Sequence, residues 1–149
     1  MRCDAPPEVA GFGATPAAAN CRTNSLKTRP LEGWNPIESL DHISRGDIIA
    51  WRFAEIKPKS DTGHVLIVTE EPIETDPGTL RVKVYDSAKV PHFDDTRGTG
   101  EGQFANGIGS GVLLFEVGEN GEPERVRFSP STHNDRHQFA MGRLEAYSS

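Results

Sequence analysis

Two polar residues in neighbouring apolar segments, His64 and Asp86, have the types and spacing that acid–base chemistry requires. His64 follows Gly63 and opens the run HVLIVTE, where a strand would ordinarily carry only aliphatic residues. Asp86 ends the alternating run TLRVKVYD. If these two strands pair antiparallel, the start of the first lies beside the end of the second, and the two side chains meet at one end of the sheet.

An imidazole that is hydrogen-bonded to a carboxylate is held in one tautomer, and its protonated form is stabilised. His64 and Asp86 would then be the base and the orienting residue of a triad that a nucleophile completes. The alternative is a histidine and an aspartate that merely face solvent at a strand end. Spacing alone leaves both interpretations open.

Other polar groups have weaker patterns. His92, Asp94 and Asp95 could ligate zinc or a harder ion, or they could form a turn. Asp94 and Asp95 could instead pair with Arg97 and brace the loop. His133 and His137 are four apart, but the segment runs into a predicted strand, and a solvated loop is expected there. The glycine-rich segment 98–111 lacks the Lys-Ser/Thr of a phosphate-binding loop and predicts a mobile loop or lid beside the cleft.

The elements that must position these residues are mostly strands. Segments 48–53, 64–70 and 79–86 have strand patterns, the run from Gly111 to Phe128 predicts a hairpin turning at Asn120-Gly121, and 137–145 predicts a final strand. Ile37, Leu40 and Ile43 recur at intervals of three, which predicts one or two helical turns after Pro36. The fold class expected is therefore α+β and strand-dominated, with about six strands in a curved antiparallel sheet or partial barrel.

Composition restricts the function classes. The chain has 149 residues and a formal net charge of −6, which suits one domain and argues against a nucleic-acid partner. No apolar run approaches the roughly 18 residues of a membrane span, and the N-terminus has no apolar signal-peptide region. Residues 1–32 are rich in Pro and Gly and predict an irregular arm, so residues 33–149 are expected to form the single domain.

Three segments, ISRGDIIAWRF, TGHVLIV and VKVYDS, resemble the NlpC-type and CHAP group of papain-like cysteine peptidases and amidases that cleave bacterial cell walls. The resemblance covers roughly residues 33 to 90. The matching positions are the Gly46-Asp47 turn, His64-Val65 and Asp86. It implies a cysteine hydrolase in which a thiolate attacks an amide carbonyl, His64 is the base and Asp86 orients it. It also implies a peptide or cell-wall amide substrate and an extracytoplasmic location, and no cofactor.

The resemblance does not extend to the nucleophile, which in this group opens a long helix. Cys3 is followed by Pro6 and Pro7, and Cys21 stands fewer than ten residues before Pro30. Three explanations are open: a nucleophile upstream of Met1, a non-catalytic descendant, or Cys21 acting from an unusual arm. The rival to a hydrolase is a binding or structural β module. Oligomeric state and compartment are not predicted.

Overall fold

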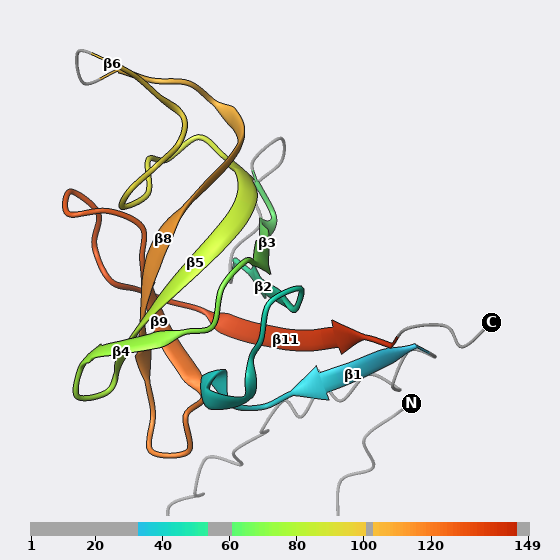
Figure 1. Ribbon diagram of the computed structural model, residues 1–149. Coiled ribbons are helices and arrows are strands. Elements are labelled where there is room, and N and C mark those ends of the chain that lie inside the picture. The colour runs from blue at the N-terminus through green and yellow to red at the C-terminus, as the bar shows by residue number, and fades with distance from the viewer. Residues whose placement is uncertain (1–32, 54–60, 101–102, 146–149) are drawn as a thin grey trace, which may run out of the picture.

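The computed structural model describes residues 33–53, 61–100 and 103–145 (Figure 1). The N-terminal arm predicted for residues 1–32 lies outside these residues, as do Cys3 and Cys21. The described strands are β1 (Trp34–Ile37), β2 (Ile48–Arg52), β3 (Gly63–Val68), β4 (Ile73–Asp76), β5 (Thr79–Ala88), β6 (Gly98–Gly100), β7 (Gln103–Phe104), β8 (Gly107–Val117), β9 (Pro123–Arg127), β10 (Asp135–Arg136) and β11 (Gln138–Leu144).

One open antiparallel sheet contains nine of these strands. Eight follow the order β1-β11-β2-β3-β5-β8-β9-β10, and β4 pairs with β5 beside this path. Strands β6 and β7 form a separate hairpin. The prediction of a strand-dominated antiparallel sheet is confirmed, and the sheet has more strands than expected. No helix in the described residues has the length and apolar character that crossing a membrane requires.

The α+β class was wrong for the part of the chain that the structure describes. The segment after Pro36 was expected to be helical, but it contains only the short 3-10 helix η1 (Leu40–His42), which follows β1. The apolar spacing of three arises because Leu40 and Ile43 reach into the core from η1 and the turn after it. Pro36 is accommodated because β1 is an edge strand that pairs only with β11.

Strands β5 and β8 are the long central pair of the sheet (Figure 1). Their register runs without a break from Thr79 opposite Glu116 to Ala88 opposite Gly107. The predicted alternation on β5 is confirmed, because every second side chain from Leu80 to Ala88 is buried. The core formed on this face contains Leu40, Ile43, Ile49, Trp51, Leu66, Val68, Leu80, Val82, Val84, Leu113, Phe115, Val126 and Met141.

Near the C-terminal end of β5, the inward-facing positions of β8 are glycines and carry no bulky side chains. Gly107, Gly109 and Gly111 precede Leu113 at intervals of two, so each stands at a position whose side chain would point to the same face as Asp86. The segment between β5 and β6 folds over this bare backbone. Gly107–Gly111 therefore belongs to β8, which corrects the expectation that it forms part of a mobile loop.

Gly111→Ala is expected to lower the free energy of unfolding by about 1–3 kcal/mol, because it forces atoms into a filled space. A Cβ at this position would lie 2.5 Å from the Cβ of His92, which has no flexible end that could move away. Urea denaturation measures the change. Gly98→Ala is the matched control, since its nearest neighbour would be the Asp95 carbonyl at 3.8 Å. Equal effects of the two substitutions would contradict the packing described.

Candidate functional site

His64 is placed by the first residues of β3. Gly63 pairs with Arg52, and its backbone passes so close to the Trp51 carbonyl that any Cβ would overlap it. This close approach sets His64 directly opposite Trp51, with the two ring centroids 5.1 Å apart. The side chain of His64 is 17% exposed and points to the inner face of the sheet, as Leu66 and Val68 do. A glycine before the histidine is therefore explained by the packing of β3 on β2.

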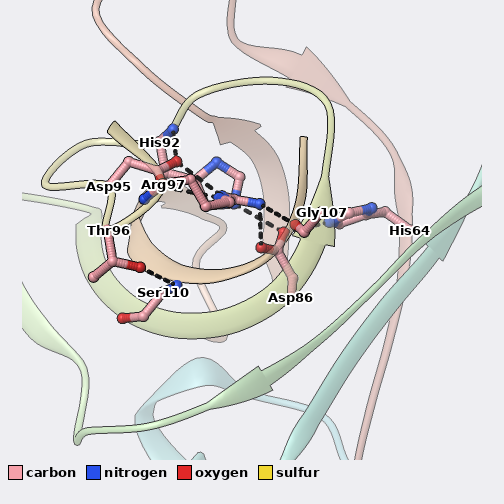
Figure 2. A network of polar contacts seen from close by, with 8 residues as sticks. All are labelled: His64, Asp86, His92, Asp95, Thr96, Arg97, Gly107 and Ser110. Atoms are coloured by element: carbon pink, nitrogen blue, oxygen red, sulfur yellow. Dashed lines mark hydrogen bonds and ion pairs between the residues drawn. The ribbon is translucent and has the colours of Figure 1, made fainter. Parts of the chain in front are cut away.

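Asp86 meets His64 as the sequence predicted. Strand β5 pairs antiparallel with β3, Asp86 lies opposite Leu66, and its side chain points inward. His64 Nε2 is 2.6 Å from Asp86 Oδ2 (Figure 2). The two residues thus share one face and one hydrogen bond. Their catalytic role remains a prediction.

A second imidazole contacts the same carboxylate oxygen. His92 Nε2 lies 2.8 Å from Asp86 Oδ2, and the side chains of both residues are fully buried. The sequence analysis considered His92 only as a metal ligand or a turn residue. The missed signal is the series of glycines at alternate positions on β8, which opens the space that His92 occupies against Gly111.

Arg97 holds the other side of this cluster. Its Nη1 lies 3.3 Å from Asp86 Oδ1, and its Nη1 also donates to the Gly107 carbonyl at 3.0 Å. Its Nε and Nη2 donate to the two oxygens of Asp95, each at 2.8 Å. The Arg97 side chain is 4% exposed, and its Cγ and Cδ atoms lie so close to Gly109 that a Cβ there would overlap them. Arg97 therefore joins two buried carboxylates (Figure 2).

Backbone hydrogen bonds fasten the segment that carries His92 and Arg97. The Asp95 carboxylate accepts from the backbone N–H groups of both residues, each at 2.8 Å. Thr96 exchanges hydrogen bonds with Ser110 of β8 at 2.8 and 2.9 Å. The predicted pairing with Arg97 is confirmed for Asp95 and was wrong for Asp94, which pairs with Arg81. This part of the connection is therefore bound to the sheet on which it lies.

The metal-site alternative is not supported by this geometry. Its three residues bind three different partners: His92 contacts Asp86, Asp95 binds Arg97, and Asp94 pairs with Arg81 at 3.0 Å. Within residues 33–53, 61–100 and 103–145, no group of three or more ligand-type side chains converges on a point where a metal ion could bind.

The charge on Asp86 fixes the hydrogen positions in the cluster. Burial by itself raises the pKa of the Asp86 carboxyl, but hydrogen bonds and charges from His64 and His92 outweigh burial and hold the pKa well below its usual range. An ionised carboxylate only accepts hydrogen bonds, so Nε2 of each imidazole carries the proton it shares with Oδ2. Nδ1 of His64 is then the ring nitrogen left to exchange a proton with a reactant.

A cleft of about 630 Å³ opens beside His64. Its wall includes the aromatic residues Trp51, Phe53, Phe128 and His137. The expectation of a solvated loop fails for His137, because its ring stacks on Trp51 with centroids 5.4 Å apart and planes 12° apart. Burial lowers the pKa of His137, and the charge on Asp135 opposes this only in part. His133 is exposed, as expected.

The nucleophile is the component that the described residues do not supply. Both cysteines of the chain, Cys3 and Cys21, fall outside them. Among the described residues, the hydrogen bonds of the His64 ring run only to Asp86. The arrangement can therefore hold and deliver a proton at the edge of an apolar cleft, and a thiol brought to Nδ1 would complete a triad.

The fold and the site define a class: an open antiparallel sheet that carries a buried His–Asp–His cluster, braced by an arginine, at the margin of an aromatic cleft. No protein-family model, curated protein or solved structure matches the chain. The site's function is therefore argued from its geometry.

Proposed function

We propose that the chain is a cysteine-type amide hydrolase domain of the NlpC/CHAP-like kind that acts on a peptide or on a cell-wall amide. His64 is the general base and acid, and Asp86 orients it. The observation that carries the proposal is the 2.6 Å hydrogen bond between His64 Nε2 and a fully buried carboxylate oxygen, with the same histidine lining the cleft. Such a bond presents Nδ1 to a nucleophile in a fixed tautomer and stabilises the imidazolium.

These positions support the following reaction. A thiol gives its proton to His64 Nδ1, and the thiolate attacks the amide carbonyl. The imidazolium then returns the proton to the leaving amine, and water, deprotonated by His64, hydrolyses the thioester. Asp86 stays ionised throughout, because two imidazole donors hold its pKa down.

Alkylation of the folded chain with iodoacetamide near pH 7 tests the proposal. We expect mass-spectrometric peptide mapping to show one of the two cysteines, Cys3 or Cys21, labelled about tenfold faster in the wild-type protein than in His64→Ala, because only the ion-paired thiol is a thiolate at this pH. The matched control is His133→Ala, which removes an exposed histidine. Slow labelling of both cysteines, unchanged by His64→Ala, would overturn a hydrolase that uses either cysteine of this chain and favour a non-catalytic binding module.

A further inference from the structure

The Asp86 carboxylate is shared in a way that an ordinary base–orienter pair is not. One oxygen, Oδ2, accepts hydrogen bonds from Nε2 of His64 at 2.6 Å and from Nε2 of His92 at 2.8 Å. Nη1 of Arg97 lies 3.3 Å from the other oxygen, Oδ1. Two imidazole donors to one oxygen divide its lone-pair density between them. The hydrogen bond that each donor makes is weaker than it would be alone.

The two imidazoles differ in what surrounds their second nitrogen. His64 is partly exposed and lines the cleft. His92 is fully buried, and its Nδ1 has no hydrogen-bond partner among the described residues. A proton on that nitrogen would be a buried donor without an acceptor, whereas a bare nitrogen leaves only a lone pair unused. The packing therefore favours Nε2 as the ring nitrogen of His92 that carries the hydrogen.

The other charged groups around His64 do not compete with it for Asp86 Oδ2 as His92 does. Arg97 is itself bound to both oxygens of Asp95, so its charge is divided between two carboxylates. Lys89 and Asp61 pair with each other at 3.8 Å on the cleft wall. His137 and Asp135 lie along the same wall, where the Trp51 ring stacks on His137 and also packs against His64. Among the residues that the structure describes, only His92 shares the oxygen that His64 uses.

We propose that His92 is a second positioning residue of the site: an Nε2–H donor that shares Asp86 Oδ2 with His64 and limits how strongly Asp86 holds the His64 imidazole. The inference rests on the proposed function for its catalytic meaning. The sharing itself does not require that any thiol be present. It can therefore be measured apart from activity.

Long-range ¹H–¹⁵N spectra of the histidine rings in the full chain at pH 8 test the sharing. In the wild-type protein, His64 and His92 should both show a protonated Nε2 and a bare Nδ1. Finding the proton on Nδ1 of His92 would overturn the inference without any substitution. Failure of the iodoacetamide test alone would leave this result unaffected, so the two proposals fail separately.

Substitution of His92 tests the donor rather than the packing. In His92→Phe the His64 Nε2–H resonance should move further downfield, because Oδ2 then serves one donor. In His92→Gln, whose amide keeps an N–H near the same place, the resonance should stay close to its wild-type position. His133→Gln is the surface control. An unmoved resonance in His92→Phe, or equal shifts in the Phe and Gln variants, would show that His92 only fills space.

Discussion

Asp86→Asn is expected to reduce labelling of the reactive cysteine about tenfold and to lower the free energy of unfolding by about 2–4 kcal/mol. An amide keeps the shape of the carboxylate but not its charge. His64 then loses the partner that stabilises its imidazolium, and the thiolate that pairs with this imidazolium is lost with it. Amide hydrolysis, where a substrate supports it, should fall by about 10³- to 10⁴-fold.

Stability decreases in this variant for a separate reason. Arg97 and two imidazole donors are arranged around a buried anion, and an amide nitrogen would face at least one of these donors. Iodoacetamide kinetics and urea denaturation measure the two effects. The matched control is Asp94→Asn, since Asp94 is 75% exposed where it pairs with Arg81 and should contribute within about 0.5 kcal/mol. An Asp86→Asn protein with wild-type labelling and stability would contradict the account of the cluster.

Arg97→Met is expected to lower the free energy of unfolding at pH 7 by about 3–5 kcal/mol, because it leaves two buried carboxylates without the cation between them. Arg97 binds Asp95 through two hydrogen bonds and faces Asp86 across 3.3 Å. Methionine fills much of the space but supplies no charge. Arg81→Met is the control, because the ion pair of Arg81 with Asp94 is largely exposed and should contribute about 0–1 kcal/mol.

The pH dependence of Arg97→Met has a defined sign. In the wild-type protein the pKa of Asp95 is lowered: burial alone would raise it, but hydrogen bonds from Arg97 and two backbone N–H groups outweigh burial. This stabilisation is complete above the unfolded pKa, about 4, and is lost as the pH falls towards the folded value. Without Arg97 burial has less opposition and the pKa of Asp95 rises. The difference in stability between wild type and variant should therefore stay constant from pH 7 to about pH 5 and shrink as the pH falls from about 4 towards the folded pKa of Asp95. A difference that grows over this interval would contradict the role given to Arg97.

Local patterns predicted the elements that build the pair. The alternation on β5 and the apolar run of β3 are visible in the sequence, and an antiparallel arrangement of neighbouring strands is enough to bring His64 beside Asp86. The error after Pro36 had a non-local cause. Strand β1 forms because it pairs with β11, so that Trp34 lies opposite Leu144 at the far end of the chain. The three-residue interval between the apolar residues after Pro36 contains no information about β11, the partner of β1.

The rest of the site depends on contacts that no short window contains. His92 and Arg97 reach Asp86 only because alternate glycines on β8 remove the side chains that would fill the inner face. The His137 ring is partly buried because β11 pairs with β2. This pairing places Phe139 opposite Trp51 and stacks the ring of His137 on the same indole. His92 and Arg97 could have been suspected from the glycine alternation on β8. Their partners could not have been assigned from it.

The most direct measurement of the central claim is the distance from His64 Nδ1 to the nearest cysteine Sγ in a crystal structure of the chain. The account predicts that Cys3 or Cys21 places its sulfur roughly 3–4 Å from this nitrogen, on the cleft side of the imidazole. A structure in which both sulfurs lie beyond about 7 Å, with the His64–Asp86 hydrogen bond intact, would contradict a hydrolase whose nucleophile is Cys3 or Cys21 and favour a binding module on the same sheet.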